Sequence, residues 1–500
     1  MRRAATFPFL GGPISAVLVG LCFEPYGSRI LPWFALSPLI YSLQRHKGQA
    51  WMRWIHGMLF GYVLCLGFLP WGFEAGLAEE SVISAARAGL LSIAAWTGFA
   101  LIPGAFSLAA GPLLRSRAAI VPLVGIPVLW TGCEVLRGPF SILPVWLSNW
   151  LSLGYAIPSG TPEAQLAALF GVYGLSFLLC LSSTAWVLVC RERLWTRQSL
   201  FALAGCLIPL ACRGLGALAL PADPLQGTAT VMAAAKQDEG AETLVELSAP
   251  LGAQGVELVV WPAIPVAELK GEGEVLLSPP AERFLRESSS YLLGHACGEP
   301  GAAGAPKREC LFLMDREGKL AGRHELKAVR GACRRESARK DGGVIRCSLG
   351  TLGVGTGSDH DSPAYARAAV DGGAALLVSS TAEVCEGRED AVEQRRGMQA
   401  LRAVECRRWF VASGTSGAFI VDPYGRTVFR ILRGIESAGT EEVEFLSGES
   451  FYCAVGWWVE PTFFLAAAGI CVWAILRLRL RRPPSASELG GAGAGSETSS

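Results

Sequence analysis

Apolar residues are concentrated in two parts of the chain, which has 500 residues. Residues 7–220 carry almost no charge outside short connections, residues 455–476 form a further apolar block, and residues 221–454 have the mixed pattern of an ordinary folded domain. A helix needs about 20 apolar residues to cross the hydrocarbon core of a bilayer. The pattern predicts about eight membrane-spanning helices, near residues 7–23, 30–43, 56–73, 89–111, 118–136, 164–190, 199–220 and 455–476. The second is short and would need support from its neighbours.

The composition agrees with a membrane protein. Hydrophobic residues make up 51% of the chain and charged residues only 17%, whereas soluble domains contain about 25% charged residues. The formal net charge of +1 provides no global field that would attract nucleic acid, so we expect no nucleic-acid partner.

Basic residues in the short loops predict the orientation, because cytoplasmic loops carry an excess of lysine and arginine. With the N-terminus inside, the outer loops carry only Arg29, Arg87 and Arg137. The inner segments carry Arg2, Arg3, Arg45, Lys47, Arg53, Arg115, Arg117, Arg191, Arg193, Arg197, Arg477, Arg479, Arg481 and Arg482. We therefore expect both termini to be cytoplasmic and the 221–454 domain to face outward.

The outward domain alternates short β-branched or apolar runs with helix-like stretches, which is typical of a layered α/β sandwich. The strands are expected at Thr228–Ala235, Val256–Trp261, Leu311–Met314, Gly350–Gly355, Ala374–Ser379, Phe410–Ser413 and Ala418–Val421, and helices at Ala364–Asp371 and Ala391–Arg408. Asp422-Pro423-Tyr424-Gly425 predicts a hairpin turn. The expected organisation is a seven-helix membrane domain (1–220), the outward domain (221–454), a last membrane helix with a basic anchor (455–482) and a disordered tail (483–500).

Several motifs in a shared order resemble the apolipoprotein N-acyltransferase family. The membrane part contains Phe23-Glu24-Pro25-Tyr26-Gly27, the residues Trp130, Glu134 and Arg137 of a W-x-x-x-E-x-L-R segment, and Gly171-Val172-Tyr173-Gly174-Leu175-Ser176. The outward domain contains Val260-Trp261-Pro262, Arg402-Ala403-Val404-Glu405 with Arg407, and Ser413-Gly414-Thr415-Ser416-Gly417. These motifs extend over nearly the whole chain, and their common order is more specific than any one of them.

The resemblance implies a nitrilase-like (CN-hydrolase) outward domain and an acyl transfer from a phospholipid to the N-terminal cysteine amine of a lipoprotein. It also implies a cysteine nucleophile that forms a thioester, a glutamate base and a lysine that stabilises the oxyanion. A thiol must be deprotonated before it attacks an ester, and the developing negative charge needs a fixed donor or cation. The expected location is the bacterial inner membrane with the nitrilase-like domain in the periplasm, and no cofactor or metal is implied.

The chain departs from the family at the base and at the nucleophile. The glutamate should follow Trp261-Pro262, but Ala263 stands there, and the nearest carboxylate, Glu268, lies beyond a further proline. The family segment G-V-x-I-C-Y-E-x-x-F-P-x-x-x-R aligns without a gap on residues 353–367, which places Gly357 at the cysteine. Asp359 keeps a carboxylate where the family has glutamate. Ser358 with His360 and Asp361 suggests a serine triad, but neighbouring residues rarely direct their side chains at a common atom.

The lysine position is ambiguous. The corresponding stretch contains Glu325, Leu326 and Lys327, and Lys327 reaches the lysine position only with a shift of one or two residues. Cys385 follows a different strand and is a weak alternative nucleophile, since a structural thiol is the commoner fate of a cysteine.

Two functional hypotheses remain. The first is a pseudoenzyme of this family that keeps the scaffold and either binds phospholipid or lipoprotein N-termini or assists an active paralogue. The second is an active lipoprotein N-acyltransferase with relocated residues such as Cys385, Lys327 and Glu268. The sequence leaves open whether Glu134, Arg137 and Tyr173 line a lipid entrance or simply pack.

Overall fold

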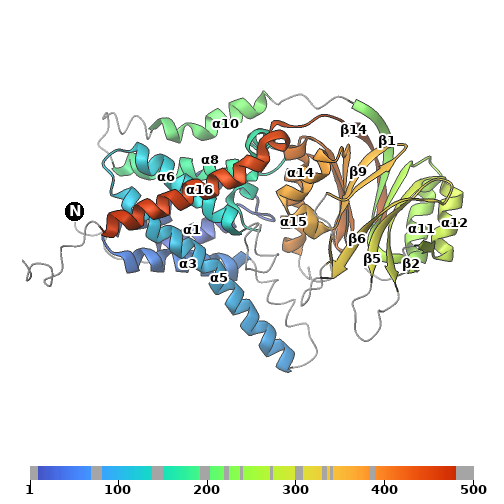
Figure 1. Cartoon of the computed structure of the whole chain (residues 1–500), viewed down its shortest axis with the longest axis horizontal. Coiled ribbons are helices and arrows are strands. Elements are labelled where there is room, and N and C mark those ends of the chain that lie inside the picture. Colours follow the sequence, from blue (N-terminus) through green and yellow to red (C-terminus); the bar gives the residue numbers. More distant parts are fainter. Residues whose placement is uncertain are drawn as a thin grey trace, which may run out of the picture.

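The computed structural model describes residues 10–68, 82–137, 150–191, 203–218, 225–236, 240–270, 274–298, 308–328, 335–337, 342–381 and 389–479. A bundle of helices forms one side of the molecule, and a domain of strands and helices forms the other (Figure 1). The long last helix, α16 (Phe451–Arg479), leaves the outward domain and packs along the bundle against α6 and α8.

Four helices in the described part of the chain are long and apolar enough to cross a membrane: Ser92–Leu114, Ile120–Arg137, Glu163–Arg191 and Phe451–Leu476. The elements of the bundle are α1 (Gly11–Gly20), η1 (Leu31–Trp33), α2 (Ser37–Arg45), α3 (Ala50–Phe68), α5 (Val82–Leu114), α6 (Ile120–Arg137), η2 (Leu153–Ala156), η3 (Glu163–Leu166), α8 (Ala167–Arg191) and α10 (Ile208–Ala217). Several apolar helices are thus present, as predicted, but the number eight is not confirmed.

The predicted span at 30–43 shows why apolar residues alone overestimate helix length. Leu31–Trp33 forms a single 3₁₀ turn, and α2 begins only at Ser37, with Pro38 in its first turn. A proline suits the start of a helix but interrupts its interior. The nine residues of α2 extend over about 14 Å at 1.5 Å per residue, which is half of a bilayer core.

The outward domain contains the strands β1 (Leu225–Ala235), β2 (Leu258–Lys270), β3 (Glu274–Leu277), β4 (Tyr291–Gly298), β5 (Glu309–Met314), β6 (Leu320–Ala328), β7 (Arg335–Ser337), β8 (Val344–Cys347), β9 (Gly350–Gly355), β10 (Leu376–Thr381), β11 (Trp409–Gly414), β12 (Gly417–Val421), β13 (Thr427–Ile431) and β14 (Ser437–Leu446). Its helices are α11 (Ala241–Gly252), α12 (Pro279–Ser288), α13 (Gly357–His360), α14 (Pro363–Asp371) and α15 (Glu389–Cys406). The main path of the sheet runs β7-β6-β5-β4-β2-β1-β11-β10-β9-β8.

Alternating side chains divide the domain into layers. Val231, Val260 and Val354 belong to an apolar core that contains residues from both halves of the sheet. The neighbouring residue Trp261 instead packs with Phe284 of α12 on one outer face. On the other outer face, α14 and α15 pack against β10 and β11, and Figure 1 shows these two helices between the strands and the helices of the bundle. The predicted layered α/β arrangement is therefore confirmed.

Helix α15 fastens the outward domain to the bundle. Helix α8 has a break at Gly171, which adopts a left-handed φ of 64° and leaves the backbone N–H of Val172 without a partner in its own helix. The carboxylate of Glu405 accepts that N–H at 2.7 Å, and Arg402 lies 2.9 Å from the same carboxylate. Arg402 also donates to the hydroxyl of Tyr155 at 3.0 Å. The R-A-x-E motif thus docks one domain onto the other.

Candidate functional site

The candidate site lies where parallel strands end. Strands β4, β2, β1, β11, β10 and β9 are parallel to one another along this path, and ligands in open α/β sheets bind at the carboxyl ends of strands. The hydroxyl of Ser380 donates to the carbonyl oxygen of Trp261 at 2.8 Å, and the N–H of Gly357 donates to the hydroxyl of Thr381 at 2.9 Å. These bonds bring the segment of Ala263 and the position of Gly357 to one edge.

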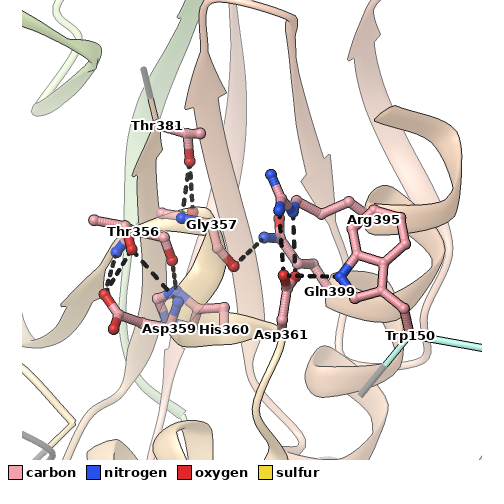
Figure 2. A network of polar contacts seen from close by, with 10 residues as sticks. Trp150, Thr356, Gly357, Asp359, His360, Asp361, Thr381, Arg395 and Gln399 are labelled. Atoms are coloured by element: carbon pink, nitrogen blue, oxygen red, sulfur yellow. Dashed lines mark hydrogen bonds and ion pairs between the residues drawn. The ribbon is translucent and has the colours of Figure 1, made fainter. Parts of the chain in front are cut away.

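Gly357 is the first residue of the short helix α13, directly after β9. Its carbonyl oxygen accepts a hydrogen bond from Gln399 at 3.1 Å, as Figure 2 shows. A Cβ atom at this position would lie 3.0 Å from Thr381 Oγ1 and 3.4 Å from both Cδ and Nη1 of Arg395. The backbone of Gly357 does not have a left-handed φ, so a side chain is possible there after a shift of a few tenths of an ångström.

A fixed guanidinium faces Gly357. Arg395 Nε and Nη2 each lie 3.3 Å from an oxygen of Asp361, and the indole N–H of Trp150 donates to the same carboxylate at 3.3 Å. The guanidinium carbon also lies 5.4 Å from the centre of the Trp150 ring. All three side chains are buried. Because Asp361 holds Arg395 on two atoms, the positive charge beside Gly357 is held in one geometry.

The other polar residues around Gly357 have local partners. Asp359 accepts hydrogen bonds from the backbone N–H and the hydroxyl of Thr356, both at 2.8 Å, and so completes a capping box for α13. His360 Nδ1 lies 3.2 Å from the carbonyl oxygen of Thr356, and its ring packs edge-on against Tyr365 and Phe410. His360 therefore packs among aromatic rings while Asp361 pairs with Arg395, and this arrangement gives no support to a triad with Ser358.

Burial makes His360 a pH-sensitive position. Desolvation lowers the pKa of His360 from 6.5 to about 4, although the neighbouring carboxylate of Asp359 opposes this change. The folded pKa lies below the unfolded one, so the unfolded state binds the proton more readily. The stabilisation is complete above pH 6.5 and is lost as the pH falls towards 4, by an amount on the order of 3 kcal/mol.

We predict that His360→Gln flattens the pH dependence of stability. Between pH 7 and pH 4.5, the melting temperature of the detergent-solubilised wild-type chain should fall more steeply than that of the variant. The comparison uses the slopes of the two curves, because the substitution itself perturbs packing against Phe410. Parallel slopes would show that His360 does not contribute to acid sensitivity.

Ala263 lies in the core between the two halves of the sheet and is only 1% exposed. Glu268 lies five residues further along the same strand, about 17 Å away at the usual rise of an extended chain. Its side chain is 73% exposed and lies 3.6 Å from the ammonium of Lys270. The structure therefore does not bring Glu268 to the edge where Gly357 lies.

The candidate lysine and the alternative cysteine lie at the limits of the part of the chain that the structure describes. In strand β6, Lys327 is opposite Glu336 of β7, but its side chain is outside the part of the chain that is described. Leu326 is buried in the core between the sheets, and the side chain of Glu325 is half-exposed near Arg308. Cys385 also lies outside the described residues.

Glu134 and Arg137 bind the segment 150–153, whose Trp150 contacts Asp361 of the site. Glu134 accepts from the indole N–H of Trp130 and from the backbone N–H of Leu153, both at 2.8 Å. Arg137 donates to the carbonyl oxygen of Trp150 at 3.4 Å. Both residues also line an apolar pocket in the bundle, whose empty space of about 380 Å³ is partly open to solvent. Tyr173, the third candidate, is buried in the core of the bundle.

A pocket beside Gly357 was not predicted from the sequence. It encloses about 540 Å³, part of it open to solvent, and its walls include the four arginines Arg395, Arg396, Arg430 and Arg433. These residues come from α15, β13 and the turn after β13, so no local motif marks them. Within the described residues, no group of three or more His, Cys, Asp and Glu side chains is placed to hold a metal ion.

Comparisons with known proteins find similarity along most of the chain. The family model described as the apolipoprotein N-acyltransferase N-terminal domain matches residues 15–185. Proteins named apolipoprotein N-acyltransferase match nearly the full chain. The relative from Geobacter metallireducens is 26% identical over 94% of this chain and 95% of its own length, and the relative from Gloeobacter violaceus is 28% identical over 92% of each.

These matches confirm the resemblance to the apolipoprotein N-acyltransferase family. Among solved structures, Saccharomyces cerevisiae Nit3, a member of branch 10 of the nitrilase superfamily, is 16% identical and aligns over 45% of this chain and 93% of its own, with a TM-score of 0.34. A carbon–nitrogen hydrolase from Helicobacter pylori is 13% identical and aligns over 48% of this chain and 94% of its own, also with a TM-score of 0.34.

Proposed function

We propose that this chain is a member of the apolipoprotein N-acyltransferase family that keeps the lipid-facing scaffold without the thioester chemistry. The observation that carries the proposal is Gly357. In the sequence alignment Gly357 falls at the family's nucleophile position. It lies at the carboxyl end of β9 and has no side chain to form a covalent intermediate. Thr381 and Arg395 border the space that a nucleophile would occupy.

The base position supports the same proposal. Ala263 cannot accept a proton, and its surroundings are the apolar residues of the core between the sheets. Residues that act as a unit in catalysis fail as a unit, and what remains is binding and weak polarisation. We therefore propose a protein that binds phospholipid and lipoprotein N-termini, and that acts beside an active paralogue.

The proposed location is the bacterial inner membrane, with both termini in the cytoplasm and the outward domain in the periplasm. The distribution of arginine and lysine between the predicted inner and outer loops supports this orientation. We also propose that the chain crosses the membrane eight times, as the sequence predicts, and not only at the four candidate helices of the described residues.

A complementation experiment tests the loss of activity. The wild-type chain is expressed in a bacterial strain depleted of its own apolipoprotein N-acyltransferase, and the acylation of lipoprotein N-termini is measured by mass spectrometry. We expect N-termini without the third acyl chain, because no thiolate is present at residue 357. Restored N-acylation that is lost in Cys385→Ser would contradict the proposal and support relocated catalysis.

A further inference from the structure

Two cysteines from distant segments meet where the outward domain joins the last helix of the chain. Cys406 is the last residue of α15, and Cys453 lies in the first turn of α16. Both side chains belong to one apolar cluster and are only 1% and 3% exposed. The two thiols are hydrogen-bonded to each other, so their sulfur atoms are in direct contact.

Further hydrogen bonds hold the backbone on both sides of this sulfur pair. The hydroxyl of Ser450 donates to the carbonyl oxygen of Glu405 and accepts the backbone N–H of Cys453 at 3.1 Å. The thiol of Cys453 also lies 3.9 Å from the carbonyl oxygen of Glu405. A disulfide forms without strain only where the two backbones are held close together. The end of α15 and the start of α16 meet this requirement through contacts that do not involve the bond itself.

The other described cysteines of the outward domain are not placed in this way. Cys310 of β5 is opposite Ala296 of β4, so Cys297, the next residue of β4, directs its side chain to the other face of the sheet. The thiol of Cys347 donates to the carbonyl oxygen of Gly350 at 3.2 Å. Within the described part of this domain, the contact at the α15–α16 junction is therefore the one that suits a disulfide.

We propose that Cys406 and Cys453 form a disulfide bond that joins the outward domain covalently to the last membrane helix. The inference rests on the periplasmic location given under the proposed function, because disulfides form and persist in oxidising compartments. It concerns neither a substrate nor the position of Gly357, and it assigns an oxidative modification to two residues that the proposed function does not use.

The oxidant is the disulfide of a thiol oxidoreductase, and the bond forms in two exchange steps. The thiolate of one cysteine attacks a sulfur atom of that disulfide, forms a mixed disulfide and releases one thiolate of the oxidant. The thiolate of the second cysteine then attacks the sulfur of the first and releases the other thiolate. The chain loses two hydrogen atoms, and the oxidant is reduced to a dithiol. Thiols buried in apolar surroundings react slowly, so the exchange takes place before α16 packs against α15.

The bond reinforces a junction that noncovalent contacts already define. Arg402 and Glu405 dock α15 onto the bundle, and Gln399 of the same helix donates to the carbonyl oxygen of Gly357. A covalent link between α15 and α16 closes a long loop of the chain, and such a link stabilises mainly by restricting the unfolded state. The stability of the full chain therefore depends on whether this link is oxidised or reduced.

Peptide mapping of the full chain tests the inference. The protein is expressed in a Gram-negative bacterium, and N-ethylmaleimide is added at lysis to block free thiols. Digestion with trypsin and chymotrypsin releases Cys406 in the peptide 403–407 and Cys453 in the peptide 453–457. We expect mass spectrometry to find these two peptides linked, and to find them separate after reduction. Recovery of both peptides as maleimide adducts from the wild-type chain would overturn the inference.

Thermal unfolding in detergent separates the bond from simple packing. Dithiothreitol should lower the melting temperature of the wild-type chain by about 4 °C or more and leave that of Cys406→Ala unchanged. The matched control Cys347→Ala should keep the full effect of the reductant. An equal effect in wild type and Cys406→Ala would overturn the inference. None of these results depends on acyl transfer, whereas an acyl adduct on the chain would overturn only the proposed function.

Discussion

Replacing Gly357 with cysteine is expected to create a reactive thiol without restoring acyl transfer. The Cβ atom would lie 3.4 Å from Nη1 of Arg395, whose charge favours the thiolate and lowers the pKa of the new thiol. Alkylation by iodoacetamide, followed by peptide mass spectrometry, should label residue 357 at neutral pH, ahead of the buried Cys310, Cys406 and Cys453. The family reaction also needs a base, and Ala263 is unchanged in this variant.

The double variant Ala263→Glu with Gly357→Cys separates the effect of the missing base from that of the missing nucleophile. General base catalysis contributes about 10²–10⁴-fold, so the double variant should form an acyl adduct at least about 100-fold faster than Gly357→Cys alone. Gly357→Ala is the control for the added Cβ atom and should form no adduct. Full acyl transfer by Gly357→Cys alone would show that the chain has a base other than residue 263.

Glu405→Gln is expected to cost about 3–5 kcal/mol of stability. The substitution keeps an oxygen that accepts the N–H of Val172 but removes the charge that faces Arg402, and both side chains are fully buried. A buried guanidinium without its counter-charge has lost the interaction that offsets its desolvation. Thermal unfolding of the full chain in detergent should show a clear decrease in the melting temperature.

The matched control is Glu282→Gln in α12. Glu282 forms an i,i+4 pair with Arg286 in which both side chains are more than half exposed, and such a pair contributes about 0.5 kcal/mol or less. If Glu405→Gln lowered the melting temperature no more than Glu282→Gln, then the Arg402–Glu405 pair would not be what holds α15 to the bundle.

The sequence predicted most of the buried strands because their apolar side chains alternate or form short runs. Thr228–Ala235, Gly350–Gly355 and Phe410–Ser413 appear as β1, β9 and β11, and the turn at residues 422–425 connects β12 to β13. Strands β3, β4, β6, β7, β8, β13 and β14 were missed. Strands β6 and β14 lie partly exposed and contain several charged residues, so their pairing depends on neighbours that a local pattern does not include.

The candidate site was predicted only in part. The register set by Pro363 and Arg367 aligned Gly357 with the family's cysteine, and in the structure Gly357 lies just after strand β9. The arginine pocket was not predicted, because Arg395, Arg430 and Arg433 meet only through the packing of α15 against β12 and the pairing of β12 with β13. The roles of Glu134 and Glu405 also depend on contacts between segments far apart in the chain, with Leu153 and Val172.

The central claim is that this chain forms no acyl thioester, and the intact mass of the purified wild-type protein tests it most directly. The chain is incubated with phospholipid vesicles, and its mass is measured before and after treatment with neutral hydroxylamine, which cleaves thioesters. The account predicts the unmodified mass in both spectra. A hydroxylamine-sensitive increase equal to one fatty acyl chain on the wild-type protein would contradict it.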